Sequence, residues 1–562
     1  MRNLLLTWLL AAACLNTQAQ DRVWVFFSDK GTDVAEKLQQ PEQFLSPEAL
    51  ERRYSLGIGV DESDLPVATA YAQAVRANSQ QLLLTSRWMN AAAVEASAEQ
   101  ISRIEALPFV TSTRPVGKLK LTRTGKTYGP LARGMNQHAV GPFDYGDATM
   151  QNEMLNVPAM HERGLTGKGV RMALFDSGFD AVDTLDAFDS LWINKQIIGY
   201  YDFVDGDTTV FREDSHGTQV LSTIAANLPG EIVGTAPHAS FILCRTEDAG
   251  SETQQEEHNW VKAMEWVDSL GVDIIHTSLG YSEFDDEEEN YTYESMDGNT
   301  AIISRAADVA ASKGIIVTTS AGNEGRGSWK YITAPCDADS VICVGAINKF
   351  GKRSSFSSFG PASDGRVKPD VVALGSRTTV VSPRNYTTSS DGTSFSGPLV
   401  AGMVACVRQA HPKRTNMDIV QAIRLSGDQY NTPDGEYGYG IPDAMFADSL
   451  LANVDDLSTV KIEDEVKPER GKPKEKPVEK PIVFTDNPQS KVIVSGGTLT
   501  VMTTSTIQEV QIMYGKQKVL LPPKSMNVSD NNAVFKTNFL QEGEHYVKIK
   551  TGSYTENVKF TP

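Results

Sequence analysis

Three segments of the chain carry the residue types of nucleophilic acyl transfer, in the order aspartate, histidine, serine. Asp176 ends a hydrophobic run that predicts a buried strand, and His216 stands at the head of a predicted helix. Ser394 lies among small residues in Gly392-Thr-Ser-Phe-Ser-Gly-Pro398 and opens an apolar helix, which exposes a nucleophile. Because a serine hydroxyl is a poor nucleophile at neutral pH, a histidine must take its proton and a carboxylate must orient that histidine. The three side chains therefore predict a serine hydrolase.

Four motifs together decide which class of serine hydrolase is predicted. They are Asp176-Ser-Gly178, His216-Gly-Thr218, Ser320-Ala-Gly-Asn-Glu-Gly325 and the 392–398 segment. In types and order they resemble the subtilisin-like serine protease family, over residues 152–452. The segment around Ser394 lacks the Gly-x-Ser-x-Gly elbow of the α/β-hydrolases, so that class is excluded.

The resemblance implies further site residues. The Asn323 amide and the Ser394 backbone N–H would stabilise the oxyanion formed during attack. Two backbone segments would line the primary specificity pocket, with a peptide substrate pairing beside them as an added strand. These segments are Ser278, Leu279 and Gly280, and Ser320, Ala321 and Gly322. The implied fold is α/β, a parallel sheet flanked by helices.

The remaining histidines lack metal-ligand spacing, and no His-Glu-x-x-His motif occurs in the sequence. His276 stands out, because the matching strand of the family usually carries asparagine there, and it could shift an edge of the pocket. The acidic segment 284–290 could attract basic substrate residues or a structural calcium ion, although such charge runs are usually solvated loops. No cofactor is required for the predicted chemistry.

The first 19 residues have the pattern of a secretory signal peptide. A basic start is followed by an apolar run and by Thr17-Gln-Ala19, a small-x-small cleavage site. The run is short for a membrane anchor, and Cys14 offers only a weak lipoprotein site. We therefore expect a secreted or cell-surface protein.

Composition limits the classes of partner. The 562 residues, 40% of them hydrophobic, can form more than one globular core. The net charge of -19 argues against nucleic-acid binding. Of the cysteines left after signal removal, Cys336 and Cys343 are close enough in sequence for a small disulfide loop. Cys244 and Cys406 are expected to be buried thiols.

A smaller domain is expected before the catalytic region at 147–452. Residues 21–117 alternate strands and helices and resemble, mainly by position, the family's propeptide, an intramolecular inhibitor and folding aid. An ordinary N-terminal domain is the alternative. Residues 118–146 would be a processing segment, cut to release the active enzyme.

The catalytic region ends in a charged, proline-rich linker at 453–481. The short strands predicted in 482–562 favour a small β-sandwich. Asn487-Pro, the 510–515 segment and the 543–552 segment resemble the C-terminal sorting domain of type IX secretion substrates, which would imply secretion machinery as a partner and an outer-membrane association. An immunoglobulin-like binding module is the alternative.

These observations predict a secreted serine endopeptidase that acts on proteins or peptides through an acyl-enzyme. The competing hypothesis is a catalytically silent surface-binding or adhesion protein on the same fold. A protein that had lost its activity would be expected to have changed at least one of the four catalytic positions. The sequence retains all four, Asp176, His216, Asn323 and Ser394.

Overall fold

A computed structural model describes residues 21–116, 143–250 and 252–457, with short strands at 126–127 and between 482 and 560. The chain divides into two compact units, Met1–Asp464 and Glu465–Pro562, and each is treated by itself. The predicted signal peptide, most of the processing segment and the proline-rich linker lie outside the described residues.

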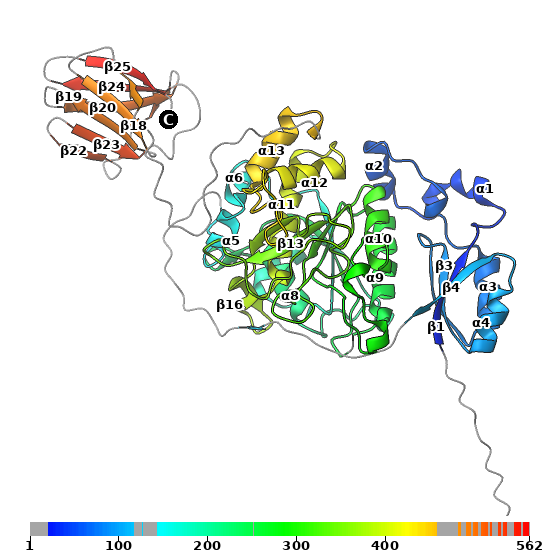
Figure 1. The fold of residues 1–562 in the computed structure, drawn as a ribbon. Coiled ribbons are helices and arrows are strands. Elements are labelled where there is room, and N and C mark those ends of the chain that lie inside the picture. The colour runs from blue at the N-terminus through cyan, green and yellow to red at the C-terminus, as the bar shows by residue number, and fades with distance from the viewer. Residues whose placement is uncertain are drawn as a thin grey trace, which may run out of the picture. The chain divides into compact units, whose positions relative to one another are not determined.

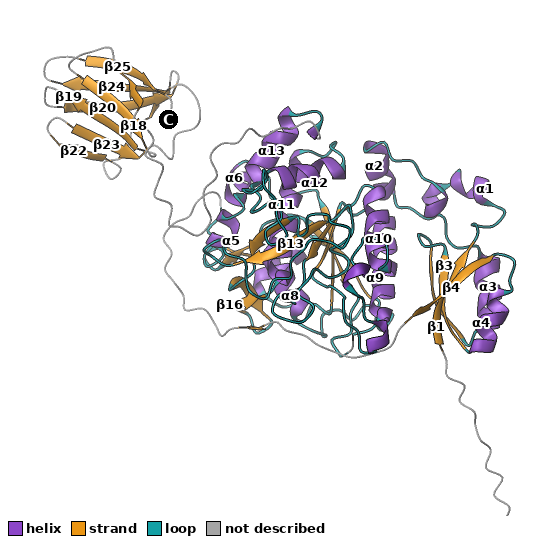
Figure 2. Ribbon diagram, in the orientation of Figure 1, coloured by secondary structure: helices purple, strands orange, loops and turns teal. Residues whose placement is uncertain are grey.

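A seven-stranded sheet forms the centre of the first unit (Figures 1 and 2). All its strand pairs are parallel, in the order β14-β13-β12-β11-β6-β10-β7. The strands are β6 Arg171–Asp176, β7 Ile197–Asp202, β10 Ser240–Arg245, β11 Ile274–Thr277, β12 Ile316–Ser320, β13 Ile342–Ile347 and β14 Val371–Leu374. This confirms the predicted α/β fold class.

Helices cover both faces of this sheet. One core packs Met172 and Leu174 of β6 with helices α8 and α11, while the other packs Ala173 and Phe175 with α9 and α10. Successive residues of β6 thus point into opposite cores, as expected for a strand buried on both faces. The helices are α5 Thr149–Glu153, α6 Val157–Glu162, α7 Asp189–Ile193, α8 His216–Ala225, α9 Gln254–Ser269, α10 Ile302–Ser312, α11 Thr393–Ala410, α12 Asn416–Leu425 and α13 Ala444–Asn453.

Capping residues in the local sequence explain where α9 begins and where α9 and α10 end. Thr253 caps α9, and its side chain shares a capping box with Glu256. Gly271 and Gly314 follow the two helices with φ angles of 80° and 87°, a left-handed conformation that glycine adopts without strain. The two glycines therefore end the helices.

Residues 21–116 form a separate layered element, as predicted. An antiparallel sheet in the order β2-β3-β1-β4 is joined by short helices. The elements are β1 Asp21–Phe27, α1 Val34–Leu38, α2 Pro47–Ser55, α3 Thr69–Asn78, β2 Gln81–Ser86, β3 Ala91–Ala96, α4 Ala98–Glu105 and β4 Val110–Val116. Trp24, Leu84 and Trp88 of this element belong to the same buried core as residues of α9 and α10. The sheet therefore packs on these two helices.

A buried ion-pair network reinforces this contact. Asp268, at the end of α9, pairs with Arg52 at 2.6 Å, with Arg53 at 2.8 Å and with Arg87 at 2.5 Å. Burial opposes ionisation of Asp268, but the three arginines outweigh it, so its pKa lies below the usual value. The N-terminal element is thus held by charge as well as by apolar packing.

The second unit consists of strands in two antiparallel sheets. Their orders are β17-β18-β19-β23-β22 and β21-β20-β24-β25. The bounds are β17 Ile482–Phe484, β18 Ser490–Ser495, β19 Thr498–Thr503, β20 Ile507–Tyr514, β21 Gln517–Val519, β22 Met526–Ser529, β23 Asn532–Lys536, β24 His545–Thr551 and β25 Thr555–Phe560. Two antiparallel sheets agree with the predicted sandwich.

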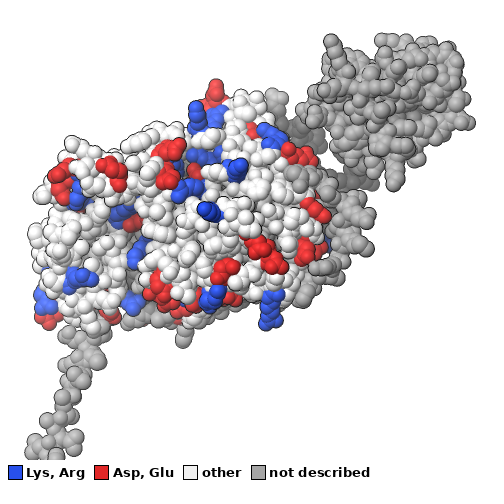
Figure 3. All heavy atoms as spheres, turned by 180° about the vertical axis from the view of Figure 1, so that it is seen from behind, with Lys and Arg blue, Asp and Glu red and all other residues white. Residues whose placement is uncertain are grey.

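Other predictions concern cysteines and the surface. Cys336 and Cys343 form a disulfide, while Cys244 and Cys406 are free and buried. Figure 3 shows acidic and basic side chains interspersed over one face of the molecule. Among the described residues, no helix combines the length and apolar character needed to cross a bilayer.

Candidate active site

Asp176 and His216 meet at the carboxyl edge of the sheet. Asp176 is the last residue of β6 and is fully buried. Its Oδ1 accepts hydrogen bonds from His216 Nδ1 at 2.8 Å and from the Ser177 backbone N–H at 2.8 Å. A carboxylate that accepts from Nδ1 leaves Nε2 as the basic nitrogen of the neutral imidazole.

Gly217 makes this approach possible. A Cβ at Gly217 would lie 2.4 Å from the Gly178 carbonyl oxygen and 2.9 Å from Asp176 Cβ. Only a residue without a side chain lets the first turn of α8 come so close to the end of β6. The His-Gly pair of the sequence motif is therefore required by packing.

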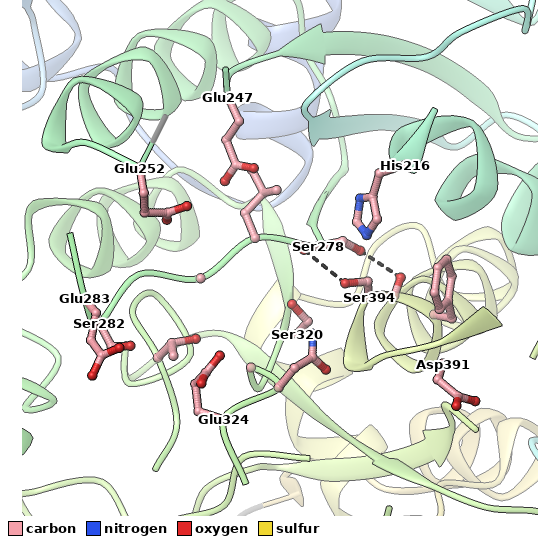
Figure 4. Close-up of a pocket in the computed structure, with 16 residues that line it drawn as sticks. His216, Glu247, Glu252, Ser278, Ser282, Glu283, Ser320, Glu324, Asp391 and Ser394 are labelled. Carbon is pink, nitrogen blue, oxygen red and sulfur yellow. Dashed lines mark hydrogen bonds between the residues drawn. The ribbon is translucent and has the colours of Figure 1, made fainter. Parts of the chain in front are cut away.

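Ser394 lies in the first turn of α11 and is held against the first pocket segment. Its Oγ donates to the Ser278 carbonyl oxygen at 3.4 Å, and Ser278 Oγ donates to the Ser394 carbonyl oxygen at 2.9 Å (Figure 4). His216 and Ser394 line the same pocket. Attack requires Ser394 Oγ to pass its proton to His216 Nε2 and so to leave the Ser278 carbonyl.

Two hydrogen bonds from Thr393 orient the Asn323 side chain. Asn323 Oδ1 accepts from the Thr393 backbone N–H at 2.9 Å and from Thr393 Oγ1 at 3.0 Å. With the oxygen fixed on the residue before Ser394, the Nδ2 group remains as the donor directed elsewhere, and Asn323 lines the pocket. This arrangement fits donation to a developing oxyanion.

The pocket beside Ser394 brings together most of the predicted substrate-binding residues. Ser278, Leu279 and Gly280 line one part, and Ser320 and Gly322 line another. Ala321 lies behind the second segment, in a small buried cluster with Ile332, Cys336, Cys343 and Ala362. Its backbone N–H donates to the Val344 carbonyl, so it fixes that segment to the sheet.

His276 occupies a buried position below the nucleophile. Its Nε2 lies 2.8 Å from Ser278 Oγ, and its Nδ1 lies 2.9 Å from Thr318 Oγ1. Burial lowers its pKa to about 3, against the opposing effect of its bond to Thr318. The imidazole is therefore neutral under ordinary conditions. It contacts the hydroxyl that binds the Ser394 carbonyl and does not line the pocket.

Several lining residues were not predicted from the sequence. They are Glu247, Glu252, Ser282, Glu283, Glu324, Thr333, Asp391 and Phe395. Glu324 follows Asn323 in the Ser320–Gly325 motif, so its place near the pocket could have been predicted from the sequence. Thr333 belongs to no motif. It reaches the pocket because an isolated β-bridge between Tyr281 and Ala334 brings its turn there.

The acidic segment 284–290 forms a structured turn with its apolar end buried. Phe284 is 5% exposed and contacts Tyr281 and Tyr291. None of its residues lines the pocket, whereas the preceding Glu283 does. Within the described parts of the chain, no group of three or more His, Cys, Asp or Glu side chains is placed to hold a metal ion.

Comparisons with known proteins agree with this geometry. A profile described as "Subtilase family" matches residues 167–440, and one described as "Peptidase S8 propeptide domain, Bacteroidota" matches residues 22–128. The second match supports the propeptide interpretation of the N-terminal element.

Individual relatives match the catalytic region. Subtilisin NAT of Bacillus subtilis subsp. natto is 33% identical over 269 residues, 47% of this chain and 62% of that protein. Subtilisin of Bacillus pumilus is 32% identical over 269 residues, 47% of this chain and 86% of that protein. Subtilisin Savinase of Lederbergia lenta is 29% identical over 294 residues, 52% of this chain and 96% of that protein. The match thus spans less than two thirds of subtilisin NAT but most of the other two. With two profiles and these relatives in agreement, the chain belongs to the subtilase family.

Proposed function

We propose that the protein is a secreted serine endopeptidase that hydrolyses peptide bonds through Asp176, His216 and Ser394. The 2.8 Å bond between Asp176 Oδ1 and His216 Nδ1 carries this proposal, because it directs the basic Nε2 of His216 toward the pocket that holds Ser394. Binding to a surface does not require an oriented base, so this geometry favours the peptidase over the adhesion protein.

In the proposed reaction His216 Nε2 accepts the proton of Ser394 Oγ as the oxygen attacks the peptide carbonyl. Asp176 stabilises the imidazolium that forms. Asn323 Nδ2 and the Ser394 backbone N–H donate to the oxyanion. His216 then returns its proton to the leaving amine, and water releases the acyl group from Ser394 by the same steps.

The N-terminal element is proposed to act as the chain's own inhibitor until the processing segment is cut. Its support is the propeptide profile match and the buried contact with α9 and α10. The signal-peptide pattern predicted in the first 19 residues supports export. A structural calcium ion and a sorting role for residues 482–562, by way of secretion machinery, remain proposals.

The test is substitution of the nucleophile. Ser394→Ala should abolish casein cleavage and labelling by a serine-directed phosphonate, because loss of the nucleophile in such enzymes costs on the order of a millionfold in turnover. Circular dichroism should show the fold unchanged, since the Ser394 hydroxyl makes only a 3.4 Å bond. Wild-type protein that neither cleaves nor labels would support the silent surface-binding alternative.

A further inference from the structure

The pocket beside Ser394 is strongly acidic. Of the described residues that line it, five are carboxylic acids and none is lysine or arginine. They are Glu247, Glu252, Glu283, Glu324 and Asp391. A cleft lined by one sign of charge attracts side chains of the opposite sign and raises their local concentration.

Two of these acids, Glu324 and Glu283, lie on the side of the pocket away from His216 and Ser394 (Figure 4). Burial, and then the charge of Glu283, raises the pKa of Glu324 above its usual value. Neither carboxylate has an ion-pair partner among the described residues. A bound cation would relieve this repulsion.

Thr333 adds a neutral acceptor in the same place. Thr333 is 2% exposed and lines the pocket, and among the described residues its Oγ1 finds no hydrogen-bond partner. The oxygen lies 2.1 Å from where a Cβ on Gly280 would stand and 2.9 Å from one on Gly322. It is therefore wedged between the two backbone segments of the pocket. A buried hydroxyl without a partner is costly unless a ligand supplies one.

The chain itself carries a peptide of matching charge. Residues 118–126, at the start of the processing segment, contain Lys118, Lys120, Arg123 and Lys126. Strand β5, Lys126–Thr127, pairs antiparallel with β16, Tyr386–Asp391, and places Lys126 opposite Asp391. The backbone of Lys126 and Thr127 thus lies as an added strand beside the strand that leads to Ser394.

We propose that this pocket selects arginine or lysine immediately before the scissile bond. Glu324 and Glu283 pair with the cationic end of that side chain, and Thr333 Oγ1 accepts a hydrogen bond from it. The inference rests on the proposed peptidase activity and names its substrate class. It also assigns the processing cut to a bond that follows a basic residue within 118–126.

The experiment uses the purified, processed protein and internally quenched peptides that differ only in the residue before the intended bond. Arginine, lysine, citrulline, leucine and phenylalanine form the set, because citrulline has nearly the shape of arginine without its charge. We expect kcat/KM for arginine to exceed that for citrulline by roughly 10-fold or more. The N-terminus of the processed protein should follow Lys118, Lys120, Arg123 or Lys126.

Two single variants test whether Glu324 and Glu283 are the source of the preference for arginine. Glu324→Gln should lower kcat/KM for the arginine peptide by roughly 10- to 100-fold and leave the leucine peptide within about 2-fold. Glu283→Gln should act in the same direction and serves as the second variant. Glu288→Gln, an exposed acid of the neighbouring turn that does not line the pocket, is the matched control and should change neither peptide.

The outcomes separate this inference from the peptidase proposal. Cleavage of casein with leucine or phenylalanine preferred to arginine would overturn the pocket assignment and leave the peptidase intact. Equal rates for arginine and citrulline would do the same. No hydrolysis of casein or of any peptide would overturn both proposals together.

Discussion

His276 is bound to the hydroxyl that supports the nucleophile's own backbone. Ser278 Oγ lies between His276 Nε2 and the Ser394 carbonyl, at 2.8 Å and 2.9 Å. The family strand usually has asparagine here, and a shorter amide would make this contact differently. A Cβ at Gly397 would lie 2.8 Å from His276 Cε1, so the larger ring is accommodated by a glycine of α11. We interpret His276 as a positioning residue for Ser394.

Substitution of His276 should therefore affect turnover more than substrate binding. His276→Ala removes the bond to Thr318 and the bond to Ser278 that supports Ser394. Loss of the second bond, worth about 1 kcal/mol, should lower kcat by roughly 5- to 10-fold with KM within about 2-fold. His276→Asn should recover part of the loss, because its amide can still reach toward Ser278. Steady-state kinetics on one peptide would measure both constants. A rise in KM with unchanged kcat would instead assign His276 to the pocket.

The catalytic residues could be predicted from the sequence, whereas the pocket residues that only the fold brings to the site could not. Asp176, His216, Asn323 and Ser394 occur in recognisable local motifs. Thr333 and Glu283 have no such signal, because only the return of the 330s loop to the pocket places them beside Gly280 and Glu324. The acidic segment 284–290 was noted for charge, yet the lining acid is its preceding neighbour.

Among the strands of the central sheet, the interior ones have a clear hydrophobic signal in the sequence, whereas the edge strand β7 has a weak one. Interior strands such as β12 are continuous buried runs. Strand β7 lies at one edge and alternates between half-buried and exposed residues until Asp202, so its hydrophobic signal is weak. Strand β14, at the other edge, has only four residues. Burial on both faces, which produces the sequence signal, is therefore incomplete in β7, whereas β14 is short but buried along its whole length.

The contact of helix α9 with the N-terminal element leads to a prediction about Asp268. Asp268→Asn leaves Arg52, Arg53 and Arg87 without their shared carboxylate in a buried place, and breaking such a network typically costs about 3–5 kcal/mol. In a Ser394→Ala background, which keeps the element attached, thermal unfolding should occur several degrees lower.

The control for that measurement is Asp183→Asn, which breaks the largely exposed ion pair with Arg212. That variant should unfold at nearly the same temperature as its parent, because exposed ion pairs contribute little to stability. If Asp268→Asn and Asp183→Asn had equal unfolding temperatures, the charge network would not contribute to holding the N-terminal element.

For the whole molecule, buried ionisable groups limit stability on both sides of neutral pH. Burial lowers the pKa of His161 to about 4 and of His258 to about 3. The unfolded chain binds protons at these sites below about pH 6.5 and the folded chain does not, so stability falls as the pH drops below that value. Burial raises the pKa of Glu257 to about 8, and the nearby charge of Asp337 adds to this rise. The folded chain there keeps a proton that the unfolded chain releases above about pH 4.5, so stability falls as the pH rises toward 8.

Glu257→Gln should remove the alkaline part of this dependence. The amide oxygen can still accept from Tyr291 OH, which lies 2.9 Å from Glu257 Oε1. In the Ser394→Ala background the variant should unfold at a higher temperature than its parent at pH 8, by about 2 °C for each kcal/mol gained. At pH 4.5 the two proteins should be equal. Equal unfolding temperatures at both pH values would show that Glu257 is already ionised in the folded protein at pH 8.

The disulfide connects the floor of the specificity pocket to the redox state of its surroundings. Cys336 donates its backbone N–H to the Thr333 carbonyl, and Cys343 belongs to strand β13 of the central sheet. The covalent link therefore anchors the turn that carries Thr333. Under the proposed export, this disulfide would be reduced in the cytosol and would form in an oxidising environment outside the cell. Substrate selectivity would then depend on whether the disulfide has formed. A copy processed early, inside the cell, would be a less selective peptidase than the exported one.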